Sequence, residues 1–223
     1  MNMIKIALIL IKELLFIKFE GIKATFHKKP PRNWESGKSG NAILIPGFLG
    51  SWYYLRKTGN FLNNLGYKIH IVTSIERNIY PISYGVNEIK KYILKHNLSK
   101  LIIVAHSKGG IISRLLLQDT EMEKRVKEVI NLSVPNIGTL WGVLRIFNVH
   151  ELTPWSKQIK EVNKNQNGIK KIINIYPEAD PYVIPNKSLY LEGARNIQVN
   201  IVGHVNILNS PITLEKISKL LND

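Results

Sequence analysis

Short apolar runs alternate with segments whose apolar residues recur every three or four positions, from residue 42 to the end of the chain. The short runs predict strands over residues 42–45, 67–72, 101–105, 126–132, 171–176 and 197–202. The periodic segments predict helices over residues 53–65, 86–95, 108–117 and 211–221. The run LIIVA at 101–105 is apolar throughout, as in a strand covered on both faces of a parallel sheet. We therefore expect an α/β fold with a mostly parallel sheet of about six strands and helices on both faces.

The first 21 residues show a separate helical pattern. Four of their five charged residues gather on one predicted face: Lys5, Lys12, Glu13 and Glu20. Lys18 falls off that face but could snorkel. Most of the remaining positions are Ile, Leu or Phe, and the longest uncharged run, Ile6 to Ile11, is too short to span a bilayer. This pattern predicts an N-terminal amphipathic helix over residues 1–21 that lies on a membrane surface. A helix packed on the rest of the protein and a poor secretory signal are the alternatives, and both stay open.

The organisation of the chain is simple. Residues 27–41, rich in Pro, Gly, Ser and charge, separate the N-terminal helix from the alternating strands and helices. We therefore expect a single domain over residues 22–223. The pattern weakens over residues 134–170, although 140–147 and 155–162 each fit a helix. This aromatic-containing segment fits either a cover over a site or an ordinary crossover.

The most informative motif is AHSKG, residues 105–109, between a predicted strand and a predicted helix. It nearly matches G-x-S-x-G, in which a strained strand-to-helix turn exposes a nucleophilic serine and requires small neighbours. Ala105 replaces the first glycine, Gly109 fits the second, and Gly110 gives the helix room to approach the strand. The motif and its context make Ser107 the candidate nucleophile. A simple helix cap would explain the serine but not the small residues around it.

On these residues the chain, from about Ala42 to its C-terminus, resembles the α/β-hydrolase family, in particular its small bacterial lipases and esterases with an A-H-S-x-G-G elbow. The segments ILIPGFLG at 43–50 and SVPNIGTLWG at 133–142 also resemble that family. The resemblance implies the α/β-hydrolase fold and an oxyanion hole formed by the backbone N–H groups of Phe48 and Lys108. Pro46 stands where the family more often has His, which leaves the backbone donor intact.

A serine nucleophile needs a base and an orienting acid, which in this family follow it in the order Asp or Glu, then His. Asp180 and His204 each follow the C-terminal end of a predicted strand, where a parallel sheet places its site. We assign Asp180 as the acid and His204 as the base. Glu178 is the rival acid, but the D-x-x-V sequence at Asp180 is closer to the family's acid loop. His106 is assigned a structural role.

The net charge of +15, from 31 Lys and Arg against 16 Asp and Glu, raises the question of nucleic acid. The cations are scattered and form no aromatic-interleaved stripe, so no nucleic-acid partner is expected. The Lys108 side chain, unusual directly after a nucleophile, either meets an anionic substrate group or is solvated. The chain has no cysteine, and no metal or nucleotide motif is present, so we expect no metal and no cofactor.

These features predict a serine hydrolase that cleaves carboxylic esters of a lipid or acyl type through a Ser-Asp-His triad and an acyl-enzyme. A thioesterase or acyltransferase with the same triad and a non-catalytic binding protein of the same fold are the alternatives. The expected partners are a small ester or lipid substrate and a membrane surface at residues 1–21. The expected location is cytoplasmic or peripheral on the membrane; secretion and the oligomeric state stay open.

Overall fold

A computed structural model describes residues 3–27 and 29–222 of the chain, with side chains from residue 8 to residue 221 apart from residue 28. Residues 1 and 2 and the Lys5 side chain of the expected N-terminal helix lie outside the described part. The described α-helices are α1 (Met3–Phe26), α2 (Arg56–Asn64), α3 (Ile82–Lys95), α4 (Lys108–Leu116), α5 (Thr120–Arg125), α6 (Lys157–Lys164), α7 (Asn206–Asn209) and α8 (Pro211–Asn222). Short 3-10 helices are η1 (Arg32–Glu35), η2 (Trp52–Leu55), η3 (Thr73–Ile75), η4 (Leu140–Leu144), η5 (Val149–Leu152), η6 (Ile169–Lys171) and η7 (Asn186–Leu189).

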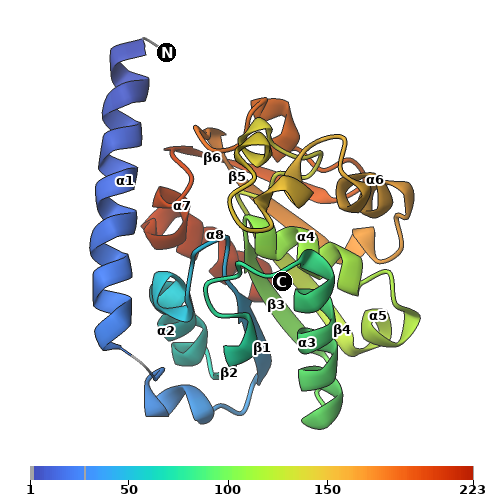
Figure 1. The fold of residues 1–223 in the computed structure, drawn as a ribbon. Coiled ribbons are helices and arrows are strands. Elements are labelled where there is room, and N and C mark those ends of the chain that lie inside the picture. Colours follow the sequence, from blue (N-terminus) through green and yellow to red (C-terminus); the bar gives the residue numbers. More distant parts are fainter. Residues whose placement is uncertain (1–2, 28, 223) are drawn as a thin grey trace.

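A single parallel sheet runs through the molecule (Figure 1). Its strands, within the described residues, are β1 (Gly40–Ile45), β2 (Tyr67–Ile71), β3 (Leu101–His106), β4 (Val126–Leu132), β5 (Ile172–Ala179) and β6 (Arg195–Val202). Their spatial order is β2-β1-β3-β4-β5-β6, and every neighbouring pair is parallel. The predicted sheet is confirmed. Because all strands point the same way, the loops that follow β1, β3, β5 and β6 open at one edge of the sheet.

The two faces of the sheet carry separate apolar layers. Alternate side chains of β3 divide between them: Ile103 packs toward α3 and α4, whereas Ile102 and Val104 pack toward α2, α7 and α8. Helices therefore cover both faces, as predicted. This double cover explains why β3 is apolar at every position from 101 to 105.

Three predicted elements differ from the structure. The N-terminal helix expected over residues 1–21 continues as α1 to Phe26, so residues 22–26 belong to the helix. The expected strand at 171–176 continues as β5 to Ala179, so that Glu178 lies within the strand and is exposed. The expected helix at 140–147 is only η4, because Arg145 adopts a left-handed conformation with φ of 50° that ends it. The other apolar segment of that region forms α6.

Helix α1 lies at the edge of the domain (Figure 1), where it packs against η2. Its acidic face turns inward: Glu13 and Glu20 are both buried, and Glu20 forms an ion pair with Arg56. The Tyr54 hydroxyl donates a hydrogen bond of 2.7 Å to the Ile17 carbonyl of α1. None of the helices in residues 3–27 and 29–222 is long and apolar enough to cross a membrane.

Candidate active site

Ser107 sits on a strained turn between β3 and α4. Its φ of 52° and ψ of −121° are rare for a residue with a side chain. The turn depends on the glycines that follow it, because a Cβ at Gly110 would lie 2.1 Å from the Val134 side chain, and one at Gly109 would lie 2.7 Å from the Ile45 carbonyl oxygen. The small residues of the motif thus let α4 start directly against β1 and β4 and leave the serine at the carboxyl edge of the sheet.

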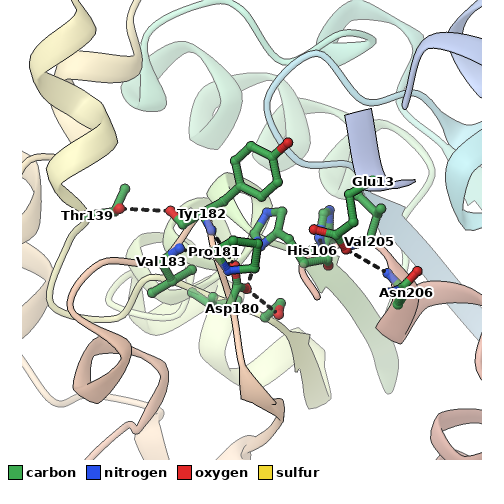
Figure 2. A network of polar contacts seen from close by, with 12 residues as sticks. Glu13, His106, Thr139, Asp180, Pro181, Tyr182, Val183, Val205 and Asn206 are labelled. Carbon is green, nitrogen blue, oxygen red and sulfur yellow. Dashed lines mark hydrogen bonds and ion pairs between the residues drawn. The ribbon is translucent and has the colours of Figure 1, made fainter. Parts of the chain in front are cut away.

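Asp180 and His204 meet at the same edge, from the ends of β5 and β6. Figure 2 shows Asp180 within its network of polar contacts. The His204 Nδ1 lies 2.6 Å from the Asp180 Oδ2. Since a carboxylate only accepts, Nδ1 carries the proton, and the Nε2 of a neutral His204 is left as an acceptor. The Ser133 hydroxyl donates to the same carboxylate at 2.8 Å, and the N–H groups of Tyr182 and Val183 donate to its other oxygen. Asp180 is therefore fully paired although it is buried.

The electrostatics of this pair favour a charged imidazole. Burial opposes the imidazolium form of His204. The charge and hydrogen bond of Asp180, together with the charge of Glu13, outweigh burial and raise the pKa of His204 above 6.5. Burial raises the pKa of Asp180. His204 and the hydrogen bonds from Ser133 and Tyr182 lower it by more, so the pKa of Asp180 lies below 3.8. Asp180 thus stays ionised and stabilises a proton taken up by His204.

His106, assigned a structural role from the sequence, contacts the backbone of His204. Burial lowers the pKa of His106 to about 3, so the ring is neutral. Its Nε2 lies 3.1 Å from the His204 carbonyl oxygen, which can only accept, so His106 donates. The two imidazole rings also lie against each other with centroids 4.6 Å apart.

The turn after β1 lies directly against Ser107. A Cβ at Gly47 would approach the His106 Nδ1 to 2.7 Å and the Ser107 Cβ to 3.0 Å, so only glycine fits there. This contact puts the next residue, Phe48, beside Ser107. Among the hydrogen bonds between described residues, none uses the backbone N–H of Phe48 or of Lys108, which leaves both groups available to a ligand.

The Lys108 side chain meets neither of the environments expected from the sequence. It is fully buried, and its Nζ donates to the carbonyl oxygens of Asn78 at 3.0 Å and Tyr80 at 2.5 Å. Asn78 in turn donates through its Nδ2 to the Pro46 carbonyl at 2.7 Å. Lys108 therefore holds the loop at residues 78–80 in place, and Asn78 of that loop in turn holds the turn that contains Phe48. Burial lowers the pKa of Lys108 to about 8.

A cavity of about 380 Å³ opens over Ser107 and His204. Its lining is almost entirely apolar. It comes from the turn after β1, helices α1 and η2, residues 135–152, and the loops after β5 and β6. The segment that the sequence marked as a cover or a crossover contributes Pro135, Thr139, Trp141, Leu144, Ile146, Val149 and Leu152. Trp141 is fixed by a 2.9 Å hydrogen bond from its ring N–H to the Pro181 carbonyl next to Asp180.

The structure brings together Asp180 and His204, and places Ser107 with His204 in one cavity, whereas the rival acid Glu178 points away from it into solvent. Sequence reasoning missed Ser133, although SVPN directly follows the end of a predicted strand, as the candidate acid and base do. It also missed the inward role of Glu13. In the described part of the chain, no three His, Asp or Glu side chains converge as metal ligands.

Comparison by sequence finds no match, neither among protein-family models nor among curated proteins. Comparison by structure finds many. The mature form of lipase BlEst2 from Bacillus licheniformis superposes with a TM-score of 0.68 at 15% identity, over 86% of this chain and 94% of that one. The monoacylglycerol lipase of Paleococcus ferrophilus gives a TM-score of 0.59 at 13% identity, over 83% of this chain and 93% of that one.

A third match is the α/β-hydrolase enzyme MGS-MChE2 from a lagoon-sediment metagenome, with a TM-score of 0.58 at 14% identity, over 83% of this chain and 90% of that one. These likenesses span almost the whole length of each neighbour. They agree with the resemblance drawn from the elbow motif. The chain therefore has the α/β-hydrolase fold and resembles lipases and esterases in structure.

Proposed function

We propose that this protein is a serine hydrolase that cleaves carboxylic esters with apolar acyl chains. One observation carries the proposal: His204, joined to Asp180 at 2.6 Å, lines the same apolar cavity as Ser107 on its strained turn. A paired imidazole is what a serine needs to lose its proton during attack. The structural likeness to lipases and esterases supports the same reaction class.

In the proposed reaction, the Ser107 Oγ attacks the ester carbonyl carbon while the His204 Nε2 takes the hydroxyl proton. Asp180 holds the imidazole through Nδ1 and stabilises its positive charge. The developing oxyanion accepts hydrogen bonds from the N–H groups of Phe48 and Lys108. His204 then returns the proton to the leaving alcohol, and water, activated in the same way, releases the acyl group from Ser107.

The cavity suits an acyl substrate. The side chains around Ser107 are those of Phe48, Leu144, Ile146, Val149 and Leu152, and they offer an acyl chain apolar contact from several sides. Removing a chain of methylene groups from water is worth about 0.8 kcal/mol per group. We therefore expect kcat/KM to rise with acyl length until the cavity is filled.

The test is hydrolysis of p-nitrophenyl esters of increasing acyl length. Ser107→Ala and His204→Ala should each lower kcat by about 10⁴-fold or more with an unchanged circular dichroism spectrum. Ser99→Ala and His150→Ala, at exposed positions, are matched controls and should retain wild-type rates. If a folded Ser107→Ala variant keeps most of the activity, the proposal is wrong.

A further inference from the structure

Helix α1 presents an apolar surface to solvent. Its outward side chains recur every three or four positions and are all about half exposed or more: Leu8, Ile11, Leu15, Phe19, Ile22 and Phe26. This spacing places them along one side of the helix, opposite the buried Glu13 and Glu20. We call them the apolar stripe. Figure 1 shows α1 at the edge of the molecule with the rest of the protein on one side of it only.

The charges around the stripe identify its partner. Exposed Lys12 and Lys18 border it on opposite sides at 100° per residue, and exposed Lys23 extends the basic edge. The two acidic residues of α1 are both buried on the inner side. A second copy laid against the stripe would bring lysines against lysines, which is unfavourable. An anionic lipid surface would instead pair with the lysines while it accepts the apolar side chains.

The mouth of the cavity lies beside the stripe. Leu14 and Ile17, on the flank of α1, line the cavity, and Leu14 is 56% exposed. Leu49, Leu144 and Ile146 line the same cavity and are exposed as well. The cavity is thus bordered by solvent-exposed apolar side chains that continue from the side of α1.

We propose that the apolar stripe docks on an anionic lipid surface, with α1 in the plane of the interface and the cavity mouth turned toward the lipid. Binding to the lipid surface does not depend on the proposed hydrolase activity. Only the idea that lipid esters enter the cavity as substrates rests on the proposed function.

The test is co-sedimentation of the full chain with vesicles of phosphatidylcholine containing phosphatidylglycerol. The double substitution Leu15→Gln with Phe19→Gln should lower the vesicle partition coefficient by more than tenfold and leave hydrolysis of a soluble p-nitrophenyl ester within twofold of wild type. Neither residue lines the cavity. The matched control is Leu94→Gln with Ile212→Gln, which removes exposed apolar side chains from α3 and α8 and should bind as wild type does.

Two further arms separate the possible outcomes. Lys12→Gln with Lys18→Gln should weaken binding to these vesicles and flatten its dependence on salt. Ser107→Ala should bind as wild type does, so that absent hydrolysis with intact binding would count against the proposed function alone. The docking proposal is wrong if the wild-type chain does not co-sediment with the vesicles. It is also wrong if light scattering shows that the wild type is a dimer and that the stripe substitutions dissociate it.

A separate observation concerns Glu13, which reaches from α1 to the loop that carries His204 (Figure 2). Its Oε1 accepts hydrogen bonds from the N–H groups of Val205 at 2.8 Å and Asn206 at 3.4 Å. The carboxyl is buried, and Gly203 makes room for it, since a Cβ there would lie 2.4 Å from the Glu13 Oε1. Two contacts therefore hold the loop: Glu13 accepts hydrogen bonds from its backbone after His204, and His106 donates a hydrogen bond to the His204 carbonyl.

We infer that Glu13 is a positioning residue that holds the histidine loop in register with Asp180 and Ser107. The titratable groups that face His204 are Asp180 from the end of β5, His106 from the end of β3, Tyr182 from the loop after β5, and Glu13 from α1. Among them, Glu13 is the group that contacts the backbone directly after His204.

The assay for this role, which rests on the proposed function, compares three variants. Glu13→Ala removes the acceptor and should lower kcat more than tenfold, with KM within about threefold. Glu13→Gln keeps an acceptor oxygen and should restore most of kcat, but without the carboxylate charge the acid limb of its pH profile should move to lower pH. Glu20→Ala, which cuts the other buried carboxylate of α1 from Arg56, should stay within threefold of wild type.

Amide hydrogen exchange gives a readout that needs no activity. The Val205 N–H should lose protection in Glu13→Ala and keep it in Glu20→Ala. Wild-type exchange at Val205 in Glu13→Ala, or equal kinetic losses in Glu13→Ala and Glu20→Ala, would show that Glu13 merely attaches the helix. Loss of protection without measurable hydrolysis in wild type would leave the positioning contact intact and refute the proposed function.

Discussion

Replacing Lys108 with Met should change how stability depends on pH. Burial lowers the pKa of Lys108 from 10.5 to about 8. Between these values the unfolded chain binds a proton that the folded chain does not, so this group makes the folded state more stable as pH rises. At 1.36 kcal/mol per pKa unit, the effect over the full window is about 3 kcal/mol. Below pH 8 the buried charge costs the folded protein a similar amount.

Methionine removes this titration together with the hydrogen bonds to Asn78 and Tyr80. Each carbonyl that loses its hydrogen bond costs about 1–3 kcal/mol. At pH 7 the substitution also removes a buried charge, which stabilises the folded state by a similar amount, so the two effects nearly offset each other. At pH 10 the folded wild type carries little charge on Lys108, so the substitution no longer gives that stabilisation. The free energy of unfolding of wild type minus that of Lys108→Met should therefore grow by about 2–3 kcal/mol from pH 7 to pH 10.

Urea unfolding followed by tryptophan fluorescence measures this difference at constant ionic strength. Titrations shared by both proteins cancel in the subtraction. Lys57→Met, at an exposed position on α2, is the control and should differ from wild type by a constant amount. If the difference for Lys108→Met is also constant between pH 7 and pH 10, Lys108 is not held in the buried, desolvated site described above.

Three other outcomes follow from the site. Asp180→Asn should lower kcat by about 10³- to 10⁴-fold, whereas Glu178→Gln, on the exposed side of β5, should cost less than about tenfold; the reverse ranking would move the acid. Because Asp180 raises the pKa of His204, the acid limb of kcat/KM should lie above pH 6.5 in wild type, and a limb at lower pH would contradict the pairing. Gly110→Ala should lower the free energy of unfolding by about 1–3 kcal/mol in urea titrations, since its Cβ would meet Val134 at 2.1 Å; an unchanged midpoint would refute that packing.

The parts predicted well from sequence are those in which local pattern and topology agree. The apolar run of β3 identifies a central strand, and small residues around Ser107 identify a turn without room for side chains. A parallel sheet then puts Asp180 and His204 at the same edge. These predictions need no knowledge of which side chains touch.

The parts that sequence reasoning missed depend on contacts between distant segments. Nothing in the sequence beside Lys108 indicates that carbonyls some thirty residues earlier, at Asn78 and Tyr80, accept its hydrogen bonds. In an amphipathic helix the charged face is expected to point toward solvent. Helix α1 instead turns Glu13 and Glu20 toward the domain, because the loop after β6 and Arg56 donate hydrogen bonds to these buried carboxylates. The spacing of seven between the two glutamates correctly put them on one face but did not say which way it points.

The most direct test of the central claim is covalent labelling by a fluorophosphonate, which traps a serine activated by a neighbouring base. The native protein should gain one adduct, located on Ser107 by peptide mass spectrometry. The adduct should be absent from Ser107→Ala, strongly reduced in His204→Ala, and retained in Ser99→Ala. An unlabelled native protein, or a label that persists in Ser107→Ala, would contradict the assignment of Ser107 as a nucleophile activated by His204.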